Sequence, residues 1–240
     1  MDTQSLYRNY VSTHFRGSGK LTRENLEMQI RYFHENYLQH LPKDRESRIV
    51  DLGSGLGHFL HFLQSEGFTN IQGVDVAAEC AAHCRAQGLS VAEDEITVYL
   101  RRLADPVDVF VLNDVLEHQT KDQMWELLGL VQKRLRPGGT LLVKVPNLAQ
   151  PILGSDSRYL DITHETGFTE HSLDQALQLS GFSPVEVFAP NIYVFKGVKN
   201  WAAMQAAGWL NRLWRVLFKL YGRTATTIFS KHLLAVARKS

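Results

Sequence analysis

Apolar and polar positions follow two alternating patterns along most of the chain. After Arg48, short apolar runs bounded by Gly, Asp or Pro alternate with longer segments whose apolar residues recur at helical spacing. The runs predict strands near residues 48–52, 71–75, 89–92, 107–113, 139–145, 184–195 and 231–238. The longer segments predict helices near residues 57–66, 77–87, 120–135 and 169–180. Near-continuous apolar strands alternating with helices are typical of a parallel sheet covered on both faces.

An additional helix is predicted before the first strand, over residues 22–41. Its apolar positions recur at helical spacing, with Thr22 placed to cap it and Leu21 placed to pack against Leu26. The preceding residues 7–20 have no periodicity, and we expect them to form a loop or lid near a site. The last two strands lack a short crossover connection, which favours an antiparallel pair at the edge of the sheet.

Composition fits a single globular domain of 240 residues, 44% apolar and 21% charged. The net charge of +1 conceals an asymmetry, since residues 196–240 hold nine of the 26 basic residues and no Asp or Glu. The same segment contains Trp201, Trp209 and Trp214, three of the four tryptophans. Such a distribution indicates an anionic partner for this end of the chain.

Several classes of protein and site are disfavoured. The first residues do not resemble a secretory signal, and no apolar stretch is long enough to cross a membrane, so we expect a cytoplasmic protein. The cysteines Cys80 and Cys84 provide no disulfide framework. With Glu79 and His83 they form only a small local cluster, so we expect no metal site and interpret both thiols as helix packing.

A glycine-rich loop follows the first strand of the core. Gly53, Gly55 and Gly57 occupy alternate positions between this strand and the next helix, where backbone can approach a ligand closely and helical N–H groups are unpaired. A dinucleotide-binding loop would require glycine where the chain has His58, which disfavours nicotinamide and flavin. The Gly-Lys-Ser/Thr sequence of a phosphate-binding P-loop is missing as well.

Asp75 ends the second strand, 18 residues after Gly57. A carboxylate at this position can accept hydrogen bonds from both ribose hydroxyls of a nucleoside. The glycine loop leaves room for a substituent on that nucleoside that contains no phosphate. The ligand indicated is a nucleoside that carries an amino acid. The alternative is that Asp75 only caps the helix starting near Ala77.

Residues 48–182 resemble the core of the class I S-adenosylmethionine-dependent methyltransferases. The resemblance lies in the following segments: Val50–Gly57, Asp75, Asn113–His118 and Leu135–Leu141. It implies a doubly wound, seven-stranded, mostly parallel α/β sheet and the cofactor S-adenosyl-L-methionine. The cofactor contacts that it implies are Asp51, Gly53, Ser54, Gly55 and Gly57 beside the methionine part, Asp75 on the ribose, and Glu93 and Asp94 near the adenine. Val76 and Asn113 are also expected to contact the cofactor.

The methyl acceptor is expected to bind in the loop after the fifth strand. A sulfonium methyl carbon is already electrophilic, so the enzyme chiefly aligns the nucleophile, and a hydroxyl acceptor also benefits from a base. His164 is our first candidate for that base, with Glu165 or Asp161 orienting its ring and Arg158 binding substrate. His118, after the fourth strand, is the competing candidate. For either histidine the alternative is a structural hydrogen bond.

Within residues 196–224, apolar and basic residues form two stripes at helical spacing. Trp209, Arg212, Trp214, Arg215 and Lys219 are typical of a helix lying in an anionic membrane interface. The alternatives are a helix packed on the sheet or on a second subunit, and, less favoured, nucleic-acid binding. Residues 225–240 are predicted to return as the last strand of the sheet, which makes this helix an insertion.

The inserted helix and the stretch Asp161–Glu165 are similar to bacterial methyltransferases of cell-surface polysaccharide (O-antigen type) biosynthesis. This narrower resemblance implies O-methylation of a lipid-linked or nucleotide-linked sugar at the cytoplasmic face of the membrane. Two alternatives remain, namely methylation of a lipophilic small molecule such as a quinone precursor, and a module that binds the cofactor without catalysis. The expected organisation is one domain over residues 1–240: a cap or lid (1–47), a cofactor-binding core (48–195), the amphipathic helix (196–224) and the last strand (225–240).

Overall fold

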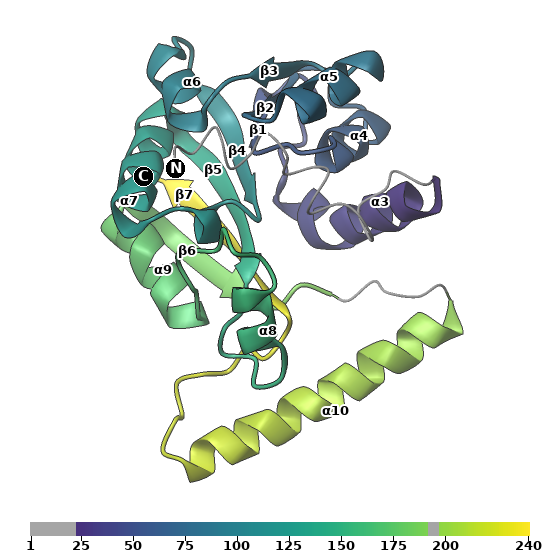
Figure 1. Cartoon of the computed structure of the whole chain (residues 1–240), viewed down its shortest axis with the longest axis vertical. Helices are drawn as coiled ribbons and strands as arrows, with labels where there is room; N and C mark the ends of the chain where they lie inside the picture. The colour runs from purple at the N-terminus through teal and green to yellow at the C-terminus, as the bar shows by residue number, and fades with distance from the viewer. Residues whose placement is uncertain (1–22, 192–196) are drawn as a thin grey trace.

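The computed structural model describes residues 23–191 and 197–240, which form one sheet between two layers of helices (Figure 1). The seven strands lie in the order β3-β2-β1-β4-β5-β7-β6. They are β1 (Ile49–Leu52), β2 (Ile71–Asp75), β3 (Val91–Glu93), β4 (Val107–Asn113), β5 (Leu135–Pro146), β6 (Phe182–Phe188) and β7 (His232–Lys239). Only β7 runs antiparallel to its neighbours. The predicted doubly wound, mostly parallel sheet is confirmed.

Helices cover both faces of this sheet (Figure 1). The helices are α3 (Arg23–Tyr37), α4 (His58–Ser65), α5 (Ala78–Ala86), α6 (Ile96–Arg102), α7 (Lys121–Arg134), α8 (Leu153–Tyr159), α9 (Glu170–Leu179) and α10 (Val198–Leu220). On one face, Phe33 and Tyr37 of α3 and Phe59 and Phe62 of α4 pack together against β4, β5 and β7. On the other, residues of α7 and α9 form the larger cluster.

Capping residues mark where α7 and α9 begin. Thr120 precedes α7 and accepts a hydrogen bond from the backbone of Gln123, whose side chain returns to the Thr120 N–H. Thr169 and Ser172 make the same reciprocal pair at the start of α9. Such capping boxes satisfy the N–H groups that a helix leaves unpaired at its N-terminus.

Two short helices were absent from the sequence prediction. The side chain of Glu95 caps α6 by accepting hydrogen bonds from the N–H groups of Thr97 and Val98, and Leu100 is buried beneath this helix. Helix α8 lies where the sequence predicted a loop, because its Gly, Ser and Asp residues are weak helix formers. Arg158 therefore belongs to the last turn of a helix and not to the loop.

Some predicted boundaries need correction. Strand β5 begins at Leu135, and Pro137, Gly138 and Gly139 form an irregularity within its ladder with β4, where a turn before the strand was expected. Strand β6 ends at Phe188, and residues 192–195 of its predicted range lie outside the described residues. The predicted lid (7–20), Leu21 and the cap Thr22 also lie outside them.

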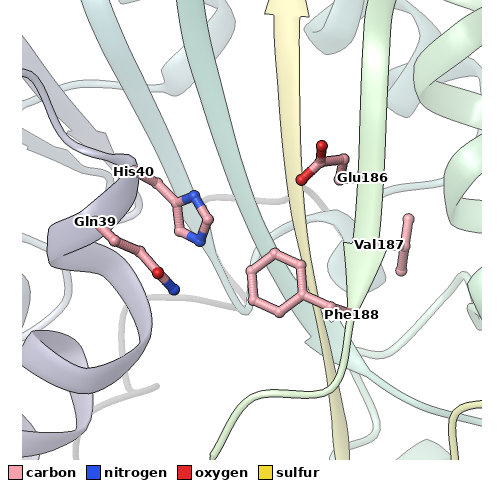
Figure 2. A pocket seen from close by; sticks show the side chains of 5 residues that line it. All are labelled: Gln39, His40, Glu186, Val187 and Phe188. Carbon is pink, nitrogen blue, oxygen red and sulfur yellow. The ribbon is translucent and has the colours of Figure 1, made fainter.

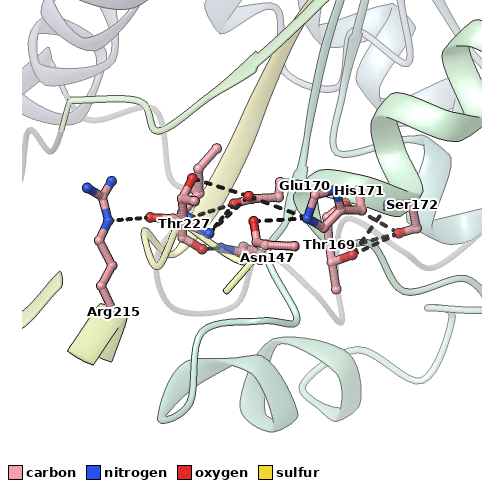
Figure 3. Close-up of polar contacts among 9 residues, drawn as sticks. Asn147, Thr169, Glu170, His171, Ser172, Arg215 and Thr227 are labelled. Atoms are coloured by element: carbon pink, nitrogen blue, oxygen red, sulfur yellow. Dashed lines mark hydrogen bonds and ion pairs between the residues drawn. The ribbon is translucent and has the colours of Figure 1, made fainter. Parts of the chain in front are cut away.

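Helix α10 is inserted between β6 and β7 as predicted, and it stands apart from the sheet on the side where α8 lies (Figure 1). Its C-terminal half is attached to the body: the ring of Phe218 contacts that of Phe229, and Arg215 Nε donates to the Thr227 carbonyl at 2.8 Å. The Thr227 N–H in turn donates to the buried carboxylate of Glu170 at 2.9 Å (Figure 3). Within the described residues, no helix is long and apolar enough to cross a membrane.

Candidate active site

The glycine loop joins β1 to α4 at the carboxyl edge of the parallel strands. Gly53 has φ +81°, and a Cβ there would lie 2.6 Å from Val115 Cγ2. Gly57 has φ +78°, and its Cβ would meet Leu89 at 2.6 Å and Cys84 Sγ at 2.9 Å. Both positions therefore require glycine for conformation and for space. Gly55 faces open space, where a ligand can approach the backbone.

The carboxylate of Asp75 connects this loop to the end of β2. Its Oδ2 accepts a hydrogen bond from the Gly55 N–H and its Oδ1 one from the Ala77 N–H, both at 2.8 Å. The second contact holds the backbone at Ala77, the N-cap residue of α5, which is close to the structural role weighed as the alternative in the sequence. Each oxygen accepts one hydrogen bond here, and a carboxylate oxygen can accept two, so both oxygens can also receive a ligand's hydroxyls. Burial raises the pKa of Asp75.

Three buried polar atoms beside the loop lack hydrogen-bond partners among the described residues: Asp51 Oδ1, Ser54 Oγ and Asn113 Nδ2. Tyr37 donates its hydroxyl to Asn113 Oδ1 at 2.5 Å, which leaves the amide nitrogen available. Burial and then the neighbouring Asp75 raise the pKa of Asp51 to about 7. Because buried polar groups are normally paired, these atoms and the open space at Gly55 fit a zwitterionic amino-acid ligand such as the methionine part of the expected cofactor.

The two acids assigned to the adenine side follow β3, next to β2. Glu93 pairs with Arg85 at 2.9 Å, and Asp94 pairs with Arg102 at 3.2 Å. The Asp94 N–H also donates to the Asp75 carbonyl, which holds this turn beside the glycine loop. Val76 is partly exposed between them. The expected cofactor residues thus share one edge of the sheet, and their individual contacts remain predictions.

A second group of side chains lies after β4 and after α8. Glu117 and His118 belong to the 3-10 turn η2 (Leu116–His118), and His164 belongs to the loop before α9. The two imidazole rings are 4.7 Å apart between centroids and inclined by 67°. One potential ligand atom from each of the three side chains lies within 4.8 Å of the others. We call Glu117, His118 and His164 the histidine cluster.

Hydrogen bonds determine which ring nitrogens carry protons in this cluster. The Thr163 hydroxyl donates to Asp161 Oδ1 at 2.7 Å, so it accepts from His118 Nδ1 at 2.8 Å. His164 Nδ1 lies 2.7 Å from the Ser157 carbonyl, which can only accept. In the neutral state, both Nε2 atoms therefore carry lone pairs. Burial, followed by the charge of His164, lowers the pKa of His118 to about 4, so His118 is neutral at pH 7.

The partners of His164 differ from the prediction. Its ring is oriented by the Ser157 carbonyl, not by Glu165 or Asp161. The Glu165 side chain is exposed, while its N–H donates to the Glu117 carbonyl at 2.7 Å. Asp161 acts on His118 through Thr163. The guanidinium of Arg158 lies 5.5 Å from the ring centroid of Tyr159.

Sequence reasoning assigned no role to Glu117 or to Lys144, and both are buried at this edge. Lys144 Nζ pairs with Asp114 at 2.6 Å and lies 5.9 Å from the ring centroid of Tyr32. Desolvation opposes both charges, but their attraction outweighs it, lowering the pKa of Asp114 and raising that of Lys144. Burial and the charge of Asp114 raise the pKa of Glu117 well above its usual range. The adjacency of Glu117 and His118 after a buried strand was the available sequence signal.

A separate pocket of about 460 Å³ opens between the 3-10 turn η1 (Leu38–His40) and β6. Gln39, His40, Glu186, Val187 and Phe188 line it (Figure 2). None of these residues belongs to the glycine loop or to the histidine cluster. The pocket is therefore not part of the predicted site.

Comparison with known proteins identifies the family. The sequence matches the methyltransferase domain family over residues 24–187, more than half of the chain. None of the curated proteins has a matching sequence. Solved structures share the whole fold, and a SAM-dependent methyltransferase from Archaeoglobus fulgidus has a TM-score of 0.63 at 21% identity, with 99% of this chain and 100% of that one covered.

Two further structures with this fold are named for different reactions. The plantazolicin methyltransferase BamL, in complex with a triazolic desmethylPZN analog and SAH, has a TM-score of 0.63 at 14% identity, with 98% and 95% of the chains covered. The cyclase SpnF has a TM-score of 0.62 at 16% identity, with 100% and 97% covered. Fold likeness alone does not determine the reaction, since a cyclase shares it. The family match, taken together with the cofactor-binding edge, identifies the class of enzyme. The chain belongs to the class I S-adenosylmethionine-dependent methyltransferases.

Proposed function

We propose that the protein methylates a hydroxyl oxygen of an acceptor bound at the histidine cluster. The supporting observation is the position of this cluster: Glu117 and His118 lie in the turn after β4, at the edge of the sheet that holds the glycine loop, and the ring of His164 contacts that of His118. Two imidazoles whose Nε2 atoms carry lone pairs in the neutral state suit a reaction that removes a proton from an acceptor. Nothing in a sulfonium leaving group requires a strong acid, so base and alignment are the main requirements.

S-adenosylmethionine supplies an electrophilic methyl group when it is bound. We assign its ribose to Asp75 and Val76, its amino-acid part to Asp51, Ser54 and Asn113, and its adenine side to Glu93 and Asp94. Gly53, Gly55 and Gly57 give the backbone its turn. The unpartnered buried atoms of Asp51, Ser54 and Asn113 support the assignment, because a zwitterion would give each of them a partner.

His164 and His118 are the candidate bases for the acceptor hydroxyl. His118 is held by the Thr163–Asp161 pair and His164 by a backbone carbonyl, and each keeps Nε2 free of a proton. Glu117 adds a buried carboxylate that favours a positive charge on either ring. An imidazole that takes the hydroxyl proton is therefore stabilised in the protonated state by a neighbouring negative charge once Glu117 is ionised.

The surroundings of the cluster favour an acceptor with a polar head and an apolar anchor. Arg158, Asp161 and Thr163 supply polar groups, with Arg158 and Asp161 assigned to substrate binding. Ile152, Tyr159, Leu160 and Ile162 expose large apolar side chains on the same segment. A lipid-linked sugar of a surface polysaccharide or its precursor has this combination. The exposed apolar residues alone would favour a lipophilic acceptor such as a quinone precursor.

We also propose that α10 places this site at an anionic membrane surface. Its outer side exposes Trp209, Leu213, Val216 and Leu220, with Trp209 69% accessible. Arg212, Arg215 and Lys219 form the adjacent basic side, and Arg212 stacks on the Trp209 ring. Trp214, which the sequence assigned to this surface, is half-buried with its indole nitrogen enclosed, so of these two tryptophans Trp209 is the one available to lipid.

Incubation of the full chain with methyl-labelled S-adenosylmethionine and a bacterial lipid extract tests the proposal. We expect label in a lipid-extractable product that mild acid hydrolysis converts to a water-soluble methylated sugar. Label that stays lipid-extractable after hydrolysis would support the quinone-type acceptor instead. Label in neither the lipid nor the water-soluble fraction, under conditions where the cofactor binds, would contradict hydroxyl methylation of either class. The variants His164→Ala and His118→Ala should bind cofactor normally and lose transfer, and full transfer in both would remove the histidines from the mechanism.

A further inference from the structure

Glu117 is an unusual side chain for a stable apolar interior. It is 2% exposed, and neither carboxylate oxygen has a hydrogen-bond partner among the described residues. Burying a carboxylate without a partner is costly, and buried charges are normally paired with a cation or bound to a metal. The described cations at this edge do not pair with it, since Lys144 is held by Asp114. An ionised Glu117 therefore needs a positively charged partner, and a bound cation would be one.

The two imidazoles next to Glu117 are arranged as metal ligands usually are. A ligating histidine binds through one nitrogen and donates the other N–H to a backbone carbonyl or to a carboxylate-linked group, which fixes its orientation. His164 donates to the Ser157 carbonyl at 2.7 Å. His118 donates to Thr163 at 2.8 Å, and Thr163 donates to Asp161 at 2.7 Å. Both remaining Nε2 atoms are in the protonation state that binds a cation.

We propose that Glu117, His118 and His164 bind a divalent transition-metal cation. One potential ligand atom from each of the three side chains lies within 4.8 Å of the other two, which brings the three residues within reach of one ion. Two imidazoles and one carboxylate suit Zn²⁺, Fe²⁺, Mn²⁺ or Co²⁺ and not Ca²⁺ or Mg²⁺, which prefer oxygen ligands only. Three protein ligands leave at least one coordination position open.

The metal site replaces the sequence-based expectation that no metal is bound, and it does not rest on the proposed hydroxyl methylation. Where that proposal also holds, the open position takes the acceptor oxygen. There the ion would lower the pKa of the acceptor hydroxyl, and His118 and His164 would hold the ion in place of acting as free bases. Cation binding and methyl transfer are measured separately, which keeps failure of one distinct from failure of the other.

Metal titration of the purified full chain, with any affinity tag removed and the protein stripped with a chelator, tests the site. Zn²⁺ and Mn²⁺ are titrated by calorimetry, and Co²⁺ by its visible absorption. We expect one ion per chain and at least tenfold weaker binding in Glu117→Gln and in His164→Ala. The control His171→Ala removes an exposed imidazole of α9 outside the cluster and should leave binding unchanged.

S-adenosylmethionine affinity and circular dichroism report whether each variant folds. Loss of the Co²⁺ spectrum in a folded Glu117→Gln or His164→Ala, with His171→Ala unaffected, would support the site. Equal metal affinity in the wild-type chain and in both cluster variants would overturn it. The proposed site would also be overturned if His171→Ala reduces metal binding as much as the cluster variants do, because the ion would then bind exposed histidines. If Glu117→Gln does not fold, the metal affinity of His164→Ala alone tests the site.

Discussion

The cofactor edge and the histidine cluster are neighbouring parts of one site, yet they are built differently. The cofactor edge consists of backbone turns and side chains at strand ends, where Gly53 has no space for a Cβ and Asp75 accepts hydrogen bonds from two backbone N–H groups. The histidine cluster joins residues 46 positions apart, and its geometry depends on hydrogen bonds from Thr163 and Ser157. Local chemistry thus determines the first part, whereas tertiary packing determines the second.

The largest expected effect is a loss of folding stability caused by a substitution at Gly53 in the cofactor edge. Gly53→Ala combines a left-handed backbone with a Cβ at 2.6 Å from Val115, and should lower the free energy of unfolding by about 3 kcal/mol. Gly67→Ala is the matched control, since Gly67 has φ +85° but no atom within 4 Å of an added Cβ. It should cost about 1 kcal/mol. Urea unfolding of both variants measures the difference, and equal costs would show that the Val115 contact does not constrain the loop.

Replacement of Asp75 should weaken cofactor binding by about 10- to 100-fold. Asp75→Asn keeps one acceptor oxygen but loses the charge and the second acceptor, and hydrogen bonds to charged groups contribute about 1.5–3 kcal/mol. The control Asp105→Asn removes an exposed carboxylate far from this edge and should bind normally. Calorimetric titration with S-adenosylmethionine gives both dissociation constants. Unchanged affinity in Asp75→Asn would leave this residue only its role as a helix cap.

The pH dependence of cofactor binding should report on Asp51. Its pKa is raised to about 7 by burial and then by Asp75, and the ionised carboxylate is the form that attracts the ammonium group of the cofactor. Affinity should therefore fall as the pH decreases below about 7, by at most about tenfold per unit. Asp51→Asn should bind weakly with a smaller pH dependence. An identical pH profile in the variant and the wild-type chain would assign the dependence to another group.

The smallest expected effect concerns α10, which belongs to neither part of the site. Arg212→Ala should weaken binding to vesicles of one part phosphatidylglycerol and three parts phosphatidylcholine by about fivefold, since one basic residue near such a surface contributes about 1 kcal/mol. Lys43→Ala removes an exposed positive charge elsewhere and should have little effect. Vesicle co-sedimentation compares the two. Equal losses would indicate a general charge effect and not a surface on α10.

The sequence was sufficient for the positions of most strands and for the glycine loop between β1 and α4, because both follow from local patterns. The apolar runs specify the strands, and glycine at positions 53 and 57 is required by the turn itself. The helix after β3 was missed although Ile96, Leu100 and Leu103 follow helical spacing, because the segment is short and polar at its start. The partners of His164 could not be predicted, because every residue has a backbone carbonyl and the sequence does not indicate which one accepts the hydrogen bond.

Glu117 illustrates the same limit. Its place beside His118 was visible, but its burial depends on how the loop before α9 folds back over η2, where Glu165 and Thr166 donate to the Glu117 carbonyl. Likewise, the inward rotation of Trp214 follows from the attachment of α10 through Phe229 and Thr227. Predicting these features requires knowledge of tertiary contacts between segments that are distant in sequence.

The central claim is that cofactor binding and the acceptor chemistry belong to these two separate sets of residues. The most direct test is calorimetric titration of S-adenosylmethionine into Asp75→Asn and Glu117→Gln, side by side with the wild-type chain. We predict that Asp75→Asn loses at least tenfold in affinity, which is about 1.4 kcal/mol of binding free energy, while Glu117→Gln stays within about twofold of wild type. An equal loss of cofactor affinity in both variants would contradict the division of the site.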